Sequence, residues 1–172
     1  IDHAHHAGNA RRALGETIEL SNAVRVAREL TNADETLIVV TADHSHTFTI
    51  SGYPKRGNPI LGLVVGSSGE SPLGTTPAPD LTGHPYTTLG YANGPGYVGA
   101  SDAQPEGPKR LPHFAKRYRA PKLGRPDLSD VDTESSLYLQ EATLPLASET
   151  HGGEDVPVYA GGPSAARAWS CS

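Results

Sequence analysis

The fold of this chain is decided by the stretch Thr36-Leu37-Ile38-Val39-Val40-Thr41-Ala42-Asp43-His44-Ser45-His46. Its first six residues form a short, unbroken β-branched run, which is typical of a strand buried on both faces in a parallel α/β sheet. An Asp/His cluster follows at once, and ligands of open α/β sheets bind at the carboxyl ends of the strands. The stretch therefore predicts an α/β fold with a site at the end of this strand.

A helix is predicted over residues 9–30, immediately before this strand. Its apolar and small residues recur at spacings of three and four, which makes one mostly apolar stripe of Ala10, Leu14, Ile18, Ser21, Val24, Ala27 and Leu30. The segment Thr31-Asn32-Ala33-Asp34 is a helix stop signal. A helix followed by a buried strand is half of a βαβ unit, which supports the α/β prediction.

Two further clusters of metal-ligand residues lie near the two ends of the chain, at Asp2-His3-Ala4-His5-His6 and His151-Gly152-Gly153-Glu154-Asp155. Asp2 and His6 are four residues apart, so one helical turn places both on the same face. A carboxylate and an imidazole suit Zn²⁺. Six of the eight histidines fall in the three clusters, which favours one metal site over a solvated His-rich terminus or hydrogen-bonded core histidines.

Residues 52–148 differ in composition from the rest of the chain. Thirteen of the 15 Pro and 13 of the 19 Gly lie there, and no helical period persists. Because a structureless loop of this length is uncommon in a compact domain, we predict an inserted subdomain of short strands and turns. We therefore divide the chain into a core at 1–51, an insert at 52–148, and a return to the core with a tail at 149–172.

A basic cluster within the insert holds half of the 14 Lys and Arg residues, at Lys109, Arg110, Lys116, Arg117, Arg119, Lys122 and Arg125. It is either a solvated loop or a loop that attracts anionic substrates. The segment Tyr91-Ala92-Asn93-Gly94-Pro95-Gly96-Tyr97, also in the insert, is a strong turn signal.

The overall composition excludes some classes of function. The chain is 36% hydrophobic with a net charge of -5, which argues against a general nucleic-acid or membrane-surface binder. It contains no run of about 18 apolar residues, so we expect no membrane span. The single Cys171 allows no internal disulfide.

The three clusters together resemble the C-terminal half of the alkaline phosphatase family, in the segments Asp2–His6, Thr41–His46 and Glu149–Asp155. Asn93-Gly94-Pro95-Gly96-Tyr97 resembles a further segment, in the family's loop-rich crown insert. The resemblance implies the C-terminal part of an α/β/α sandwich with a crown-like insert. It also implies hydrolysis of phosphate monoesters with two Zn²⁺ ions and one Mg²⁺ ion.

The resemblance implies a ligand set for both zinc ions. Asp2, His6 and His151 match the protein ligands of the first zinc. Asp43 and His44 match two ligands of the second zinc. Two zinc ions about 4 Å apart can clamp the attacking and leaving oxygens of a phosphoryl transfer.

Three other residues match family positions close to the metals. His46 matches a residue that orients the carboxylate of the first zinc's aspartate. His3 matches a position near the phosphate. Tyr53 matches a residue that reaches towards the partner subunit's active site, so the resemblance also implies a homodimer.

The sequence departs from the family by lacking its nucleophile motif, an Asp-Ser pair followed by small residues and Thr. In the family, the serine, the phosphate-binding arginine, the Asp that bridges the second zinc and magnesium, and the magnesium-binding Glu all belong to the N-terminal half. We therefore expect a fragment, a nicked chain or an incomplete sequence, inactive without that half.

Two other functions and one other metal stay open. The chain could be a non-catalytic zinc-binding or interaction module, or a phosphodiesterase of the same superfamily. Two histidines and one carboxylate also suit Fe(II), although the Asp43-His44 pair favours zinc. The long insert and the wording of Glu149–Asp155 look more like bacterial members of the family, which implies a periplasmic or secreted protein.

Overall fold

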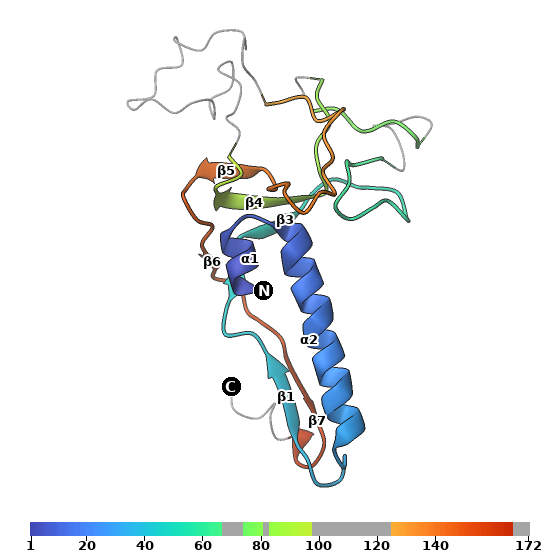
Figure 1. Cartoon of the computed structure of the whole chain (residues 1–172), viewed down its shortest axis with the longest axis vertical. Helices are drawn as coiled ribbons and strands as arrows, with labels where there is room; N and C mark the ends of the chain where they lie inside the picture. The colour runs from blue at the N-terminus through green and yellow to red at the C-terminus, as the bar shows by residue number, and fades with distance from the viewer. Residues whose placement is uncertain (67–73, 81–82, 98–124, 167–172) are drawn as a thin grey trace.

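The computed structural model describes residues 1–66, 74–80, 83–97 and 125–166, and Figure 1 shows their arrangement. None of the helices in these segments is long and apolar enough to cross a membrane. The elements in chain order are α1 (Asp2–His6), α2 (Ala10–Leu30), β1 (Ile38–Thr41), β2 (Ser45–His46), β3 (Phe48–Ile50), β4 (Leu89–Gly94), β5 (Ala142–Pro145), β6 (His151–Gly152) and β7 (Val158–Gly161).

Helix α2 confirms the helix predicted over residues 9–30. Asn9 is its N-cap, and its side-chain oxygen accepts a hydrogen bond of 3.0 Å from the backbone N–H of Arg12. The helix ends where the stop signal begins, because Thr31 has extended backbone angles. Ala10 and Ala13 are its only buried residues, while Leu30 at the far end is 81% exposed.

The strands form three small sheets. Strands β1 and β7 pair antiparallel, and so do β2 and β6, where His46 stands opposite His151. In the third sheet the order is β3-β4-β5, with β3 antiparallel and β5 parallel to β4. The second sheet thus joins two of the three Asp/His clusters directly.

Strand β1 corrects the prediction of a parallel strand buried on both faces. Its residues alternate between half-buried and exposed, and its partner β7 runs antiparallel to it. The physical reason is that no third strand pairs with this two-stranded ribbon in the described part of the chain. A hollow of about 800 Å³ lies between the ribbon and α2 and is lined by the half-buried Ile38 and Val40, while Val39 and Thr41 on the other face of β1 are exposed.

The predicted turn at residues 91–97 is confirmed only in its second half. Tyr91–Gly94 continue β4, and the turn itself falls at Pro95 and Gly96. The cause is pairing, because β4 is the central strand of its sheet and is held by β3 and β5 on its two sides. Strand β3 comes from the predicted core and β4 from the predicted insert, and the domain boundaries stay a prediction.

Arg125 is the one member of the predicted basic cluster within the described residues, and it is paired rather than solvated. Its guanidinium donates to both carboxylate oxygens of Glu141, at 2.8 and 2.5 Å, and also to Asp80. Burial lowers the pKa of Arg125, but its bonds to Glu141 and Asp80 outweigh burial and raise it. Residues 109–124 and Cys171 lie outside the described residues.

Two ends of the molecule, whose elements Figure 1 shows, differ in how far their side chains are buried. We call α1, the first turn of α2 and strands β2 to β6 the site end, and the rest of α2 with β1 and β7 the ribbon end. The site end contains buried Ala4, Leu89, Tyr91 and Glu149. At the ribbon end Ile18, Leu30, Val39 and Tyr159 are exposed.

Candidate metal centre

Helix α1 and the β2–β6 pair bring the predicted ligand types to one point. Asp2 and His6 lie on the same face of α1, with Asp2 Oδ1 3.3 Å from His6 Nε2. His46 and His151 face the same side of their sheet because they are directly opposite each other in the register. His151 Nε2 lies 3.2 Å from His6 Nε2, although 145 residues separate the two in sequence.

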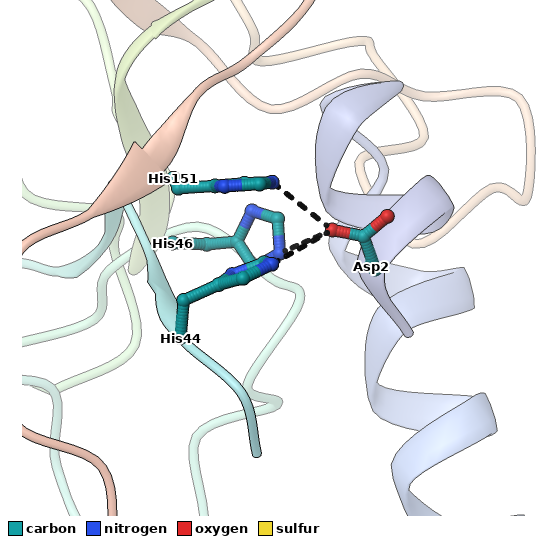
Figure 2. Close-up of side chains that lie close together, drawn as sticks. All are labelled: Asp2, His44, His46 and His151. Atoms are coloured by element: carbon teal, nitrogen blue, oxygen red, sulfur yellow. Dashed lines mark ion pairs between the residues drawn. The ribbon is translucent and has the colours of Figure 1, made fainter.

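The centre of the site is a single atom, Asp2 Oδ1. Four imidazole Nε2 atoms surround it, and Figure 2 shows three of these rings pointing at the carboxylate. The distances are 3.1 Å from His46, 3.3 Å from His6, 3.4 Å from His151 and 3.8 Å from His44. Segments at residues 2–6, 44–46 and 151 therefore converge, as the three sequence clusters suggested.

Three of these rings have their other nitrogen committed to an oxygen acceptor. His6 Nδ1 lies 2.5 Å from the Glu149 carbonyl, and His44 Nδ1 lies 3.1 Å from the Ser45 carbonyl. His46 Nδ1 lies 2.7 Å from the Glu149 carboxylate. An oxygen acceptor requires the proton on Nδ1, and in a neutral imidazole this leaves a lone pair on Nε2.

The arrangement fits a metal ion. Lone pairs on Nε2 of His6 and His44 face a carboxylate oxygen, so acceptors face an acceptor, whereas His46 lies between two carboxylates, those of Asp2 and Glu149. Asp2 Oδ1 is accordingly buried with no hydrogen-bond partner, despite the four nearby rings. A buried acceptor without a partner is costly, and a cation among these atoms satisfies all of them.

The donor atoms are close enough to share one ion. One nitrogen or oxygen each from Asp2, His44, His46 and His151 lie within 4.8 Å of one another, and so do atoms of His6, His46 and Glu149. Imidazole and carboxylate donors suit zinc and other divalent transition metals. The two groups share His46.

The electrostatics keep the carboxylate ionised. Partial desolvation raises the pKa of Asp2, but attraction to His6, His46 and His151 outweighs it and lowers the pKa below its usual range. The neighbouring His5 lies in a different environment, because burial and then the nearby His46 lower its pKa to about 4. His5 stacks on His46, with ring centroids 4.6 Å apart, and is hydrogen-bonded to the Tyr91 hydroxyl at 2.9 Å.

Three further residues predicted from the resemblance have exposed side chains. The Asp43 side chain is 87% exposed, and its carboxylate contacts His44 at 3.5 Å rather than the Asp2 group. His3 is 93% exposed and lies 3.8 Å from the outer oxygen of Asp2. Tyr53, which follows β3, is 83% exposed.

Ser45 is the hydroxyl nearest to the histidines in sequence, and it faces the other side of its strand. It is paired with Gly152, one position before the His46–His151 pair, so its side chain points to the opposite face. Its hydroxyl donates to Glu154 at 2.5 Å, and this bond is the largest cause of the lowered pKa of Glu154. Ser45 is therefore bonded away from the metal centre.

Reasoning from the sequence did not find the role of Glu149, although that residue opens the third motif. Its side chain is 0% exposed and accepts bonds from His46 and Thr47. A buried Glu gives no local signal in a sequence, because its partners come from distant segments. Its position two residues before His151 is the one hint that the sequence offers.

Comparisons with known proteins place the chain in a family. The family model for alkaline phosphatase matches residues 1–169. The chain is 42% identical over 167 residues to the tissue-nonspecific alkaline phosphatase isozyme of Gallus gallus, and 40% identical over 167 residues to that of Homo sapiens. It is 39% identical over 165 residues to an alkaline phosphatase of Gadus morhua.

These matches cover 96% of this chain but only 25% to 28% of the relatives. The chain thus spans about a quarter of the length of the curated relatives it matches. All three are animal proteins, and the resemblance to bacterial members stays a prediction.

Proposed function

This chain belongs to the alkaline phosphatase family, and we propose that it forms the metal-binding C-terminal portion of a phosphomonoester hydrolase. The observation that carries the proposal is the convergence of four imidazoles on the buried, unbonded Asp2 Oδ1. A buried carboxylate oxygen that has no hydrogen-bond partner and lies among imidazole nitrogens is a site for a divalent cation.

We assign Asp2, His6 and His151 to a first zinc ion, and His44 with Asp43 to a second. When bound, zinc at such a site acts as a Lewis acid on phosphoryl oxygens and lowers the pKa of water to about 7. The protein's own contribution is orientation, because the Nδ1 bonds of His6 and His44 to backbone carbonyls fix the direction of both rings. Mg²⁺, in this proposal, is held mostly by residues outside this chain.

His46, in this proposal, holds the Asp2 carboxylate in place. Its Nε2 is the ring nitrogen closest to Asp2 Oδ1, and its Nδ1 is bonded to a buried carboxylate. His3 lies on the open side of the centre, near the outer oxygen of Asp2, where a phosphate group could approach.

We propose that the nucleophile and the phosphate-binding arginine belong to the part of the relatives' length that these 172 residues do not match. Ser45 is unsuited as the nucleophile because its hydroxyl is bonded to Glu154 on the opposite face. The exposed β-branched residues of β1, together with the hollow lined by α2, β1 and β7, suit a covering segment from that part. Burying such a face is the main driving force for two halves of a domain to associate.

The remaining features of the proposal come from the family resemblance. We propose that residues 52–148 form a crown-like insert and that Tyr53 reaches towards a partner subunit in a homodimer. The substrates are phosphate monoesters, and the protein is periplasmic or secreted. The exposed position of Tyr53 after β3 leaves its ring free to make such a contact.

The experiment measures zinc binding and phosphatase turnover separately. The 172-residue chain is titrated with Zn²⁺ after chelator treatment, and we expect one tight ion per chain that His6→Ala abolishes. The matched control is His84→Ala, because His84 is bonded to the Arg125 carbonyl and lies outside the centre. Metal analysis of the purified protein before chelator treatment distinguishes bound zinc from bound Fe(II).

Turnover is then assayed with p-nitrophenyl phosphate and with its bis ester. We expect none from the 172 residues alone, and monoester hydrolysis from a longer polypeptide that contains them. Preference for the diester would favour a phosphodiesterase, and a zinc-loaded longer polypeptide without turnover would favour a non-catalytic module. Turnover by the 172 residues alone, lost in His6→Ala, would overturn the assignment of the nucleophile.

A further inference from the structure

Strand β4 has one face directed towards the metal centre. Tyr91 and Asn93 are two positions apart in this strand, so their side chains lie on the same face. The Tyr91 hydroxyl is bonded to His5 at 2.9 Å, and the Asn93 side chain is bonded to Thr150. Each of these partners immediately precedes a histidine that we assigned to the first zinc ion. One face of one strand therefore contacts both segments that supply those histidines.

Asn93 holds Thr150 by two hydrogen bonds. The backbone N–H of Thr150 donates to Asn93 Oδ1 at 3.0 Å, and Asn93 Nδ2 donates to the Thr150 hydroxyl at 2.8 Å. Because a backbone N–H can only donate, it fixes the orientation of the amide, and Nδ2 must face the hydroxyl. The backbone and the side chain of Thr150 are thus held by the same partner.

The backbone of β4 approaches the same segment one residue further along the strand. Gly94 has a φ of +141°, which residues with side chains rarely adopt, and a Cβ added there would lie 3.2 Å from the Glu149 Cβ. Glu149 directly precedes Thr150, and its side chain is fully buried. Strand β4 therefore restrains the two consecutive residues that lead into His151.

His151 depends on such restraints more than the other rings of the centre. Its side chain is 50% exposed, more than those of the other three histidines around Asp2 Oδ1. Strand β6, which begins with it, has only two residues, and so has its partner β2. Yet His151 Nε2 lies 3.2 Å from His6 Nε2. Because packing holds this ring less than the others, its direction follows from the backbone that precedes it.

We propose that Asn93 is a positioning residue of the metal centre: by holding Thr150, it keeps His151 within reach of the first zinc ion. Asn93 lies within the predicted insert, whereas every zinc ligand assigned above lies outside it, so this contact couples the insert to the centre. The inference rests on the proposed function for its metal, but the positions of the rings can be measured without metal.

The test is Asn93→Ala in the 172-residue chain, which removes both bonds to Thr150. In the metal-free parent we expect the Thr150 amide to exchange more slowly than an unprotected amide, and the rings of His6 and His151 to show a nuclear Overhauser contact. In Asn93→Ala we expect fast exchange of that amide and loss of the ring contact. Asn93→Asp should retain both signals, because its carboxylate accepts from the N–H and from the hydroxyl of Thr150.

The consequence is read as zinc affinity by isothermal titration. We expect Asn93→Ala to weaken it by about tenfold, the low end of the usual cost of losing an outer partner of a ligand, because Thr150 is exposed and water replaces part of what is lost. The matched control is Asn58→Ala, since Asn58 is also in the predicted insert and its side chain donates to the Leu63 carbonyl at 3.1 Å and accepts from the Val65 N–H at 3.2 Å. It should leave zinc affinity and Thr150 exchange within about twofold, because effects at separate sites are independent.

The parent alone can overturn the proposal, even if a variant fails to fold by circular dichroism. An unprotected Thr150 amide in the folded parent contradicts it, as does an unchanged ring contact in folded Asn93→Ala. A zinc affinity that falls equally in Asn93→Ala and Asn58→Ala also contradicts it, because the effect would then be a general loosening of the insert. If the ring contact is lost in Asn93→Ala but the parent binds no zinc, the positioning role stands and the proposed metal function fails.

Discussion

The site end and the ribbon end of this molecule differ in how far their side chains are buried and bonded to other segments. At the site end, residues far apart in sequence meet: Glu149 contacts His6 and His46, and the Gln140 side chain accepts from the backbone N–H of Ala10. At the ribbon end, the β1–β7 pair and most of α2 expose apolar side chains, with a hollow between them.

The difference shows which part of the fold covers its apolar side chains with other described residues. Helices and two-stranded ribbons in water draw most of their stability from a covered apolar face. The site end has that cover, whereas the ribbon end leaves apolar side chains of α2, β1 and β7 exposed. The following predictions compare matched changes at the two ends, from the largest expected effect to the smallest.

The largest effect is expected from a pair of leucine substitutions. Leu89 in β4 is 2% exposed, whereas Leu30 at the end of α2 is 81% exposed. Leu89→Ala should reduce the free energy of unfolding by about 2–5 kcal/mol, because it removes packed methyl groups and leaves a cavity. Leu30→Ala should change it by less than about 0.5 kcal/mol.

Urea unfolding followed by far-UV circular dichroism measures both changes. Equal losses would mean that Leu30 is covered in solution, for example by self-association of the ribbon end. Sedimentation at two protein concentrations detects self-association, and so distinguishes that outcome from one in which Leu89 is packed no better than Leu30.

The second comparison uses two aspartates, Asp2 in α1 and Asp43 just after β1. Asp2 has four imidazoles around one oxygen, while Asp43 follows β1 directly and contacts only His44 among the imidazoles of the centre. In the 172-residue chain Asp2→Asn should weaken zinc binding by more than about 100-fold, since loss of an outer partner alone costs up to that amount. Asp43→Asn should weaken it by less than about threefold, because that side chain is solvated.

Isothermal titration with Zn²⁺ measures the two affinities. If both substitutions had the same effect, Asp43 would belong to the same ion as Asp2. The assignment of Asp43 to a second ion would then be wrong.

The same contrast explains what the sequence could predict. Helix α2 was predicted to within one residue at its start, because its apolar period and its stop signal are local. The convergence of Asp2, His44 and His151 followed from their resemblance to a family, and spacing alone could not have shown it. Local patterns also carry no information on which strands pair, so β1 was assigned to a parallel sheet although its partner here is antiparallel β7.

Buried polar partners were the least visible in the sequence. Glu149 and Arg125 resemble solvated charges when they are read along the chain, yet each is bonded to residues from distant segments. Arg125 was included in a cluster interpreted as either a solvated loop or a loop that attracts anionic substrates. Only the fold brings Asp80 and Glu141 to it, because β5 lies beside β4.

The third comparison concerns two arginines. Arg125 is part-buried and bonded to Glu141 and Asp80, whereas Arg25 makes an exposed i,i+4 pair with Glu29 on α2. Arg125→Met should cost about 2 kcal/mol of unfolding free energy, less than the roughly 3–5 kcal/mol of a fully buried pair because some solvent remains. Arg25→Met should cost less than about 0.5 kcal/mol. Added salt should reduce the smaller effect further, and an Arg125→Met loss that vanished in salt would show that its carboxylates are solvated.

The smallest effect is expected from the polar residues at the two ends of α2. Asn9 is buried at the site end, where its side chain accepts from the Arg12 N–H and donates to the Ser136 carbonyl at 2.8 Å. Thr31 at the ribbon end is exposed, and its hydroxyl donates to the Ala27 carbonyl at 2.7 Å within its own helix.

Asn9→Ala should cost about 1 kcal/mol, because it leaves the Arg12 N–H without its cap. Thr31→Ala should change stability by no more than about 0.5 kcal/mol, because water replaces the lost bond on an exposed surface. Hydrogen exchange gives the sharper measurement, since Asn9→Ala should speed exchange in the first turn of α2 and leave its last turn unchanged. Faster exchange along the whole helix in Asn9→Ala would show that α2 depends on its site-end anchor for its entire length. The ribbon end would then be held only through that anchor.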